Sequence, residues 1–311
     1  MIITIALVFL ITLLLVSGYF FLFACYRKPL FGSKKIGETP NLTGYQMERL
    51  LDDIEWLEAQ NIETVHYYAR KVVSLSARLI RNKNSKKIAV LVHGYRSTPQ
   101  KFACIARHYF EELGYSLLLP DQRAHGESDG RFITFGYEES TDMFFWARYI
   151  QHTFGSDVKI VYHGVSMGAA TVAMMPEMHL PRCIKGLIVD CGYTSAKEIF
   201  QYILKKDFHI PKFLAIPVIK TVSLISETFA DFPFDECEPV EAVKKAKIPM
   251  LFIHGKEDKF VPCEMGIEMY EACACNEKDL LLIEGAGHAV SHLTDSKTYE
   301  EGLDGFLSKV M

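Results

Sequence analysis

Residues 159–174 combine an apolar strand pattern, a pentapeptide of the form G-x-S-x-G at residues 164–168, and small residues that begin a helix. A serine held on a strained turn between a strand and a helix needs small neighbours, because the two elements approach closely there. Gly164 and Gly168 supply that space on either side of Ser166. A plain tight turn with an incidental serine would contain the same glycines. The strand-turn-helix context favours the first interpretation, in which the Ser166 hydroxyl projects from the turn.

Short apolar segments alternate with helical patterns from residue 87 onward, after strand-like segments that begin near Glu63. Such alternation is typical of a parallel sheet covered by helices on both faces. The sequence therefore predicts the α/β class with a mostly parallel sheet. The predicted strands are residues 87–93, 115–119, 159–162, 186–190, 250–254 and 280–283, and two of the helices are marked by Met143, Trp146, Ala147 and Ile150 and by Tyr299, Leu303, Phe306 and Val310.

Residues 194–240 interrupt this alternation, with many aromatic residues and several prolines but no clear strand. We expect a helical cap inserted after the strand at residues 186–190. Its aromatic side chains either form a core of their own or line an apolar pocket for an acyl group. The pattern alone leaves both possibilities open.

Residues 1–26 carry no charged side chain, and a membrane-spanning helix needs about 20 such residues. A core helix seldom stays apolar on every face over this length. A secretory signal peptide would begin with a basic region and end at a small-x-small site, and neither is present. The sequence predicts a retained transmembrane anchor at residues 1–26, with lipidation of Cys25 as a minor alternative.

Basic residues follow the predicted span at Arg27, Lys28, Lys34 and Lys35, and none precedes it. The positive-inside rule then predicts a single-pass protein of the cell membrane with its large domain in the cytoplasm. The scattered positions of the eight cysteines suit reduced thiols, although a large domain is also exported regardless of flanking charge.

Residues 27–62 read as a tether followed by an amphipathic helix, and residues 63–311 as the main domain with its cap at about 194–240. The polar face of the helix is acidic, so we expect the helix to pack on the domain rather than lie on a bilayer. Asn41 begins a glycosylation sequon, which matters only in a glycosylating compartment.

A serine nucleophile needs a base that is held by a carboxylate, and the order Ser, Asp, His along the chain is one known arrangement. Asp258 and His288 each follow a predicted strand, where open α/β sheets place their ligands. They are the predicted acid and base for Ser166. Asp190, which also ends a strand, and Glu257 are alternative acids.

An oxyanion formed at Ser166 would need two backbone donors. The amide of Met167, directly after the serine, is one candidate, and the amide of Tyr95, in the loop after the strand at residues 87–93, is the other. His292 stands four residues after His288, a spacing that suits metal ligands on a helix, but no glutamate-bearing zinc motif accompanies it. We expect a surface or supporting role for His292.

These residues together resemble the α/β-hydrolase superfamily over about residue 63 to the end of the chain. The resemblance is closest to its serine aminopeptidase-like and lysophospholipase-like branch, some members of which have an N-terminal anchor. That branch carries a D-x-R-G-x-G-x-S element, matched at residues 121–128 with Ala124 in place of a glycine. Residues 190–195 also fit, near the entry to the cap. The resemblance implies that Asp121, Arg123 and Ser128 brace the loop beside the active site.

The predicted activity is hydrolysis of a carboxylic ester through an acyl-enzyme, and a lipid-like ester is one candidate substrate. An amidase, peptidase or acyltransferase would use the same three residues, and a non-catalytic binding protein of this fold is a further alternative. No nucleotide-binding or metal-binding spacing is present, so no cofactor or metal is expected. Cys273 and Cys275 are predicted to lie on different faces of a helix. The net charge of −4 argues against a nucleic-acid partner. The expected partners are a small-molecule or lipid-like substrate and the membrane. No oligomeric state is predicted.

Overall fold

The computed structural model describes residues 1–27, 42–69, 73–83 and 85–311. Its centre is an eight-stranded sheet with the order β1-β2-β4-β3-β5-β6-β7-β8. The pairs β1/β2 and β2/β4 are antiparallel, and the pairs from β4/β3 onward are parallel. The strands are β1 Ile62–Ala69, β2 Val73–Ile80, β3 Lys87–Val92, β4 Ser116–Pro120, β5 Lys159–Val165, β6 Ile184–Asp190, β7 Met250–Gly255 and β8 Lys278–Ile283.

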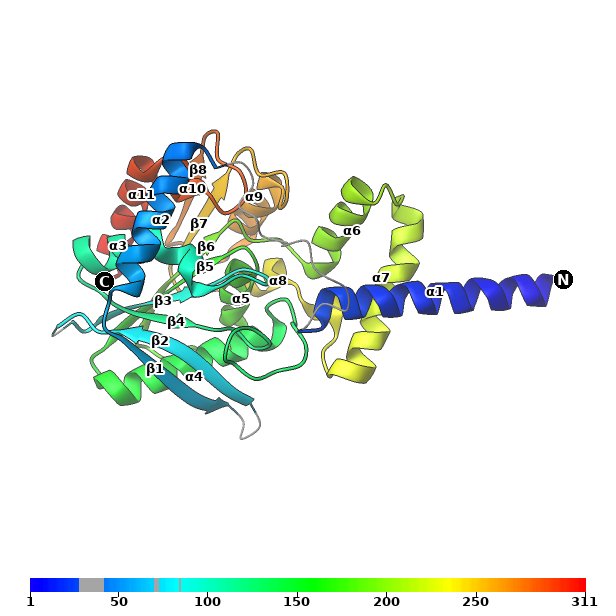
Figure 1. Cartoon of the computed structure of the whole chain (residues 1–311), viewed down its shortest axis with the longest axis horizontal. Coiled ribbons are helices and arrows are strands. Elements are labelled where there is room, and N and C mark those ends of the chain that lie inside the picture. The colour runs from blue at the N-terminus through cyan, green and yellow to red at the C-terminus, as the bar shows by residue number, and fades with distance from the viewer. Residues whose placement is uncertain (28–41, 70–72, 84) are drawn as a thin grey trace.

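Helices cover both faces of the sheet, as the alternating pattern predicts (Figure 1). Helices α4, α5, α8 and α9 pack on one face, and α2, α3 and α11 pack on the other. The helices are α1 Ile2–Cys25, α2 Gly44–Glu58, α3 Ala103–Arg107, α4 Tyr137–Phe154, α5 Met167–Met174, α6 Ala196–Asp207, α7 Lys212–Ala230, α8 Pro239–Val243, α9 Cys263–Ala272, α10 Ser291–Thr294 and α11 Ser296–Val310, with single turns of other helix types at Pro99–Phe102, His108–Glu112, Met175–Glu177 and Phe234–Glu236.

The strands are buried on both faces because alternate side chains point to opposite sides of the sheet. In β3, Ile88 and Val90 belong to one core cluster, and Ala89 and Leu91 belong to the other. This double burial explains the continuous apolar runs from which the strands were predicted. All six predicted strands are present, with ends that differ by no more than three residues.

The structure corrects one minor expectation about the cysteines near the end of the chain. Helix α9 ends at Ala272, so Cys273 and Cys275 lie in the segment after it and not on a helix. Both residues are buried and belong to the core cluster beneath α9.

Helix α2 packs on the domain, as its acidic polar face predicts. Thr43 caps its start: the Thr43 hydroxyl accepts from the Gln46 amide, and the Gln46 side chain accepts from the Thr43 amide. The Gln46 side-chain amide also donates to the Leu293 carbonyl at 3.2 Å. Leu50 and Leu57 point inward and are buried.

Helix α1 is apolar throughout and long enough to span a membrane. Its first half extends away from the rest of the chain, and its second half lies beside α7 (Figure 1). Helices α6, α7 and α8 occupy the insertion between β6 and β7. Most of the predicted tether, with Lys28, Lys34, Lys35 and the sequon residue Asn41, lies outside the described residues.

Candidate active site

Ser166 sits on a strained turn between β5 and α5. Its backbone has φ 58° and ψ −117°, which is unfavourable for a residue with a side chain. A Cβ at Gly164 would lie 2.1 Å from the Gly168 carbonyl oxygen, and a Cβ at Gly168 would lie 1.9 Å from the Val92 carbonyl oxygen. Only glycine fits at either position, so the pentapeptide is a steric requirement of the turn.

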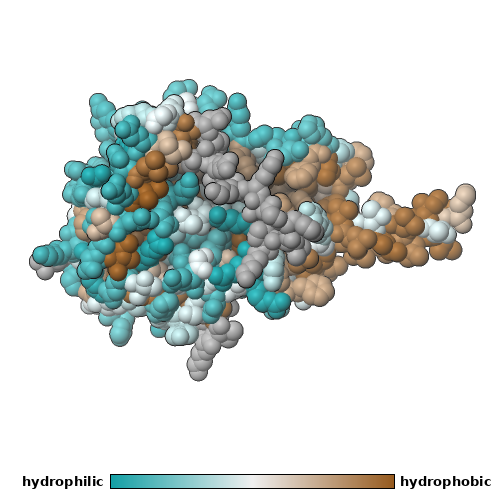
Figure 2. Space-filling model, in the orientation of Figure 1, coloured by the Kyte–Doolittle hydropathy of each residue, from teal (hydrophilic) through white to brown (hydrophobic). Residues whose placement is uncertain are grey.

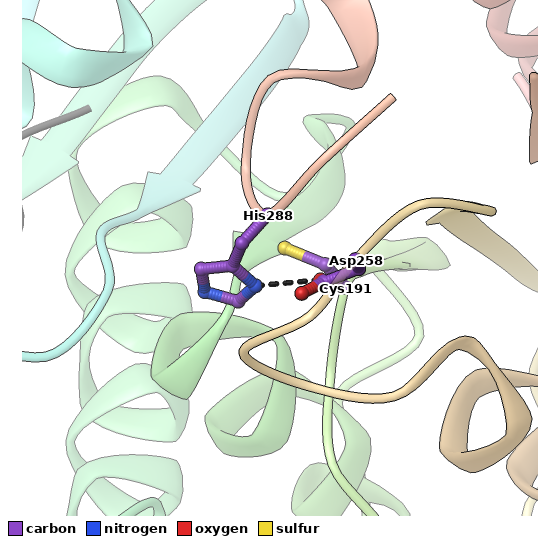
Figure 3. Close-up of side chains that lie close together, drawn as sticks. All are labelled: Cys191, Asp258 and His288. Carbon is purple, nitrogen blue, oxygen red and sulfur yellow. Dashed lines mark hydrogen bonds and ion pairs between the residues drawn. The ribbon is translucent and has the colours of Figure 1, made fainter. Parts of the chain in front are cut away.

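Ser166, His288 and Asp258 form a continuous chain of hydrogen bonds. The distance between Ser166 Oγ and His288 Nε2 is 2.9 Å, and the distance between His288 Nδ1 and Asp258 Oδ2 is 2.7 Å. The three side chains come from the loops after β5, β8 and β7, at one edge of the sheet. Figure 3 shows the His288 ring directed at the Asp258 carboxylate. A base hydrogen-bonded to a serine and oriented by a carboxylate is the arrangement that activates a serine nucleophile.

Asp258 is held ionised and in a fixed orientation. Its Oδ1 atom accepts from the backbone amides of Phe260 and Val261 at 2.8 and 2.9 Å. Burial raises the pKa of Asp258, but hydrogen bonds from His254 and His288 outweigh it and hold this pKa well below its usual range. The Asp258 carboxylate is therefore charged at every pH at which the protein is expected to work.

Asp190, the alternative acid, has a different partner. Its Oδ2 atom accepts from the Tyr299 hydroxyl at 2.8 Å, and the same hydroxyl lies 3.0 Å from His163 Nε2. Burial raises the pKa of Asp190 to about 6, although the Tyr299 hydrogen bond lowers it. The other alternative, Glu257, is exposed. Among the described carboxylates, the contact with His288 thus belongs to Asp258.

A cavity of about 220 Å³ opens beside Ser166 and His288. None of the described residues between 194 and 240 lines it. The alternative in which the cap lines an acyl pocket is therefore wrong for this cavity. Its walls include residues of α2, the loop after β3 and α10. The apolar part of the lining includes Leu50, Phe102, Cys104, Ile105, Val165, Phe260, Ala289 and Leu293.

Some of the cap aromatics, Phe200, Tyr202, Phe232 and Phe234, follow the other expectation and belong to a core of their own, whereas Phe208, Phe213 and Phe229 are exposed. The Phe200 ring lies 5.1 Å from the Phe135 ring and 5.2 Å from the Phe234 ring. It also contacts Phe20 of α1, with the ring centroids 5.6 Å apart. The second half of α1 is thus part of the cap core.

The loop after β3 lies directly over Ser166. A Cβ at Gly94 would lie 3.3 Å from the Ser166 Cβ, so this glycine allows the loop backbone to pass close to Ser166. The amide of Met167 opens α5, and amides of a helix's first turn have no partner within the helix. Both amides predicted as oxyanion donors therefore belong to segments beside Ser166.

The side chains of Tyr95 and Arg96 bind the end of α1. The Tyr95 hydroxyl donates to the Ala24 carbonyl at 2.8 Å. Arg96 Nη2 donates to the carbonyls of Phe23 and Tyr26 at 2.8 and 3.0 Å. The last carbonyls of a helix have no partner within it and carry negative partial charge, so an arginine is well suited to this place. Helix α1 and the loop over Ser166 are thereby joined.

Backbone contacts complete this junction. The Ile133 amide donates to the Cys25 carbonyl at 2.7 Å, and the Arg27 amide donates to the Arg131 carbonyl at 2.9 Å. The chain is thus fixed to the domain directly after α1. Sequence analysis missed Arg96, because no local pattern links it to residues 23–26, about 70 positions earlier.

The D-x-R-G-x-G-x-S element braces the same region. The Asp121 carboxylate accepts from the Glu127 amide at 2.9 Å, and Arg123 forms a two-point ion pair with Asp142. Ala124 has φ 59°, which explains why a glycine suits this position in related chains. The direct contact with the loop over Ser166 comes from His125, whose Nε2 accepts from the Arg96 amide at 2.9 Å.

A metal site fits these residues poorly. Cys191, Asp258 and His288 place possible ligand atoms within 4.8 Å of one another (Figure 3). However, burial raises the pKa of Cys191 well above its usual value, so this thiol stays protonated. His292 is buried rather than on the surface, and its Nε2 lies 2.8 Å from a carboxylate oxygen of Glu300. It is a packed residue of the cavity wall.

Known proteins share this fold and sequence pattern. A family model described as "alpha/beta hydrolase fold" matches residues 90–222, and one described as "Serine hydrolase (FSH1)" matches residues 161–298. The chain is similar to YqkD of Bacillus subtilis, with 27% identity over 203 residues, or 65% of each chain. It is also similar to the membrane protein YNL320W of Saccharomyces cerevisiae, with 22% identity over 208 residues, or 67% of this chain and 66% of that one.

The matched regions thus span slightly less than two thirds of these curated relatives. Among solved structures, the esterase Pf2001 of Pyrococcus furiosus superposes with a TM-score of 0.66 and 21% identity, over 90% of this chain and 100% of that chain. These matches support a hydrolase function and agree with the fold. The chain belongs to the α/β-hydrolase superfamily.

Proposed function

We propose that this protein is a serine hydrolase that cleaves a carboxylic ester through an acyl-enzyme. The observation that carries the proposal is the chain of hydrogen bonds from Ser166 through His288 to Asp258 beside an apolar cavity. The match to a serine hydrolase family model and the likeness to an esterase support it.

In the proposed reaction, Ser166 Oγ bonds to the ester carbonyl carbon while His288 Nε2 takes the hydroxyl proton. The amides of Tyr95 and Met167 donate to the resulting oxyanion. The bond to the alcohol oxygen then breaks as His288 gives that oxygen its proton. A water molecule, deprotonated by His288, attacks the acyl-enzyme, and Ser166 regains its proton as the acid leaves.

The cavity supports an apolar acyl group as the recognised part of the substrate. At about 220 Å³ and with this apolar lining, the cavity suits a short or medium acyl chain. The charged Asp258 carboxylate does not line the cavity, whereas Leu50 and Leu293 do. A lipid-like ester fits this lining.

The proposed location is the cell membrane, with α1 as a single-pass anchor and the catalytic domain on the cytoplasmic side. The length and composition of α1 support the anchor, and the description of the yeast relative as a membrane protein agrees with it. Arg27 and the lysines that follow it in the sequence support the orientation.

A fluorophosphonate probe tests the proposed nucleophile. The full-length wild type is expected to be labelled, and Ser166→Ala is expected to show no label, because the probe forms its bond with an activated serine. Equal labelling of both proteins would rule out Ser166. Wild type without label at any pH between 6 and 9 would indicate a non-catalytic binding protein. Hydrolysis of aminoacyl amides in preference to p-nitrophenyl esters would indicate the amidase alternative.

The junction between α1 and the loop over Ser166 gives a prediction about turnover. Arg96→Met should lower kcat by about tenfold with little change in KM, since a small displacement of an oxyanion donor weakens transition-state binding more than substrate binding. Arg96→Lys should recover part of the loss, because a lysine also donates to carbonyls. The measurement is kcat per active site, with the concentration of active sites determined by titration, so that unfolded protein is not counted as enzyme.

The matched control for this prediction is Arg148→Met, an exposed arginine on α4. It should leave kcat unchanged. An unaltered kcat in Arg96→Met would mean that the end of α1 does not hold the loop.

A further inference from the structure

Helix α1 enters the protein before it has risen far enough to cross a bilayer. Side chains up to Val16 are mostly exposed, whereas Ser17, Phe21, Ala24 and Cys25 are buried. The exposed part has about fifteen residues, which rise about 22 Å. The hydrocarbon layer of a membrane is about 30 Å thick. A spanning α1 therefore needs part of its buried half at hydrocarbon depth, together with whatever packs there.

Helix α7 packs there. The Ser17 hydroxyl donates to the Val218 carbonyl, in the middle of α7, at 3.4 Å. Helix α7 crosses α1 at a steep angle and contacts it at the second half of α1 (Figure 1). If Ser17 and the residues just after it lie within the hydrocarbon layer, the outer surface of α7 lies at the membrane boundary.

The outer surface of α7 and of the turn before it is apolar to a degree that is uncommon for a surface in water. Figure 2 shows the hydrophobic colour continuing from α1 onto this part of the molecule, while most of the opposite end is hydrophilic. Five large apolar side chains on this surface are between 46% and 71% exposed, and we call them the cap ridge. They are Phe208, Phe213, Leu214, Leu224 and Phe229.

Helix α7 is not suited to crossing the membrane itself, although its length and composition would allow it. Its inner face is buried, with Ile219 and Val222 in the cap core. Lys220 and Glu227 are exposed along its outer face. The charged ends of these two side chains reach water only if the helix lies near the boundary between membrane and water. An apolar face with a few long charged side chains is typical of a helix that lies in the membrane interface.

We propose that the cap ridge inserts into the membrane leaflet next to the domain, beside α1, so that two elements hold the protein on the bilayer. The occupant of this surface is lipid. The proposal does not depend on the reaction at Ser166. It depends on insertion of α1, and it fixes which end of the domain faces the membrane.

The test uses the full-length chain with one introduced cysteine at a time, labelled with a polarity-sensitive dye. The eight native cysteines are all buried, so the introduced thiol is the accessible one. The ridge positions are Phe213→Cys and Leu224→Cys. Leu15→Cys, on the exposed part of α1, is the membrane reference, and Tyr68→Cys, 72% exposed on β1, is the water reference. The proteins are reconstituted in phosphatidylcholine vesicles with a minority of phosphatidylglycerol and with nitroxide-bearing lipids.

The two ridge labels are expected to emit at shorter wavelength than the Tyr68→Cys label and to be quenched by shallow nitroxides. The Leu15→Cys label should be quenched by deep nitroxides. Ridge labels that behave like the Tyr68→Cys label would overturn the proposal, and so would an α1 label outside the lipid. Ridge labels that are shielded from water but untouched by nitroxides, and that crosslink between chains, would identify a second copy as the occupant and also overturn it.

Discussion

Replacing Ser166 with alanine is expected to lower kcat for a short p-nitrophenyl ester by on the order of 10⁶. The substitution removes the atom that bonds to the carbonyl carbon, so the acyl-enzyme cannot form. His288 and Asp258 then have no nucleophile to activate, and the remaining rate reflects the oxyanion donors and substrate binding. The measurement is the steady-state rate together with thermal unfolding of both proteins. The fold should be unaffected, because alanine meets the same backbone strain at φ 58° as serine does.

Ser97→Ala is the matched control, because it removes another hydroxyl that lines the same cavity. Its kcat should stay within about tenfold of the wild type, since Ser97 belongs to the cavity wall and takes no part in the proposed proton transfer. If both serine variants lost activity equally, the loss would reflect the cavity and not the nucleophile.

Asp258→Asn is expected to lower kcat by on the order of 10⁴. The amides of Phe260 and Val261 donate to the position of Oδ1, so the asparagine oxygen should occupy that position and its NH₂ group should face His288 Nδ1. His288 would then carry its proton on Nε2 and could no longer accept the proton of Ser166. The substrate affinity should change little, because Asp258 lies behind His288. The measurements are kcat and KM over pH 6 to 9.

Asp190→Asn and Glu257→Gln separate this prediction from a general effect of removing charge. Asp190 bonds to Tyr299, and Glu257 is exposed, so each variant should retain kcat within about tenfold. The opposite ranking, with Asp190→Asn the most impaired, would assign the acid to Asp190.

The arrangement at the end of α1 changes how the anchor is understood. A tether would leave the domain free to move relative to the membrane, whereas here the carbonyls of residues 23–26 bind the domain directly. The contact partners include Tyr95 and Arg96, which follow Gly94 over the proposed nucleophile. Removal of α1 would therefore expose the cap core and loosen this loop, in addition to removing the proposed anchor.

Several features were readable from the amino-acid sequence because their causes are local. The turn at Ser166 is required by the contacts of Gly164 and Gly168, and those glycines are adjacent to it in the chain. The central strands β3 to β7 are readable because side chains on both of their faces are buried. The proximity of Asp258 and His288 to Ser166 follows from a general rule, since loops at the carboxyl ends of parallel strands meet at one edge of a sheet.

Other features depend on contacts between residues that are distant in sequence, and only the tertiary structure decided them. Asp190 ends β6 and Asp258 lies in the loop after β7, and what separates them is that Tyr299 contacts Asp190 and His288 contacts Asp258. The cavity wall includes Leu50 of α2 and none of the described cap residues, because α2 packs against α3 and the turn at Pro99–Phe102. The joining of α1 to Arg96 has the same origin. A local pattern specifies the turn, the strands and the apolar helix, but their partners are set by how the whole chain packs, and no short segment contains that information.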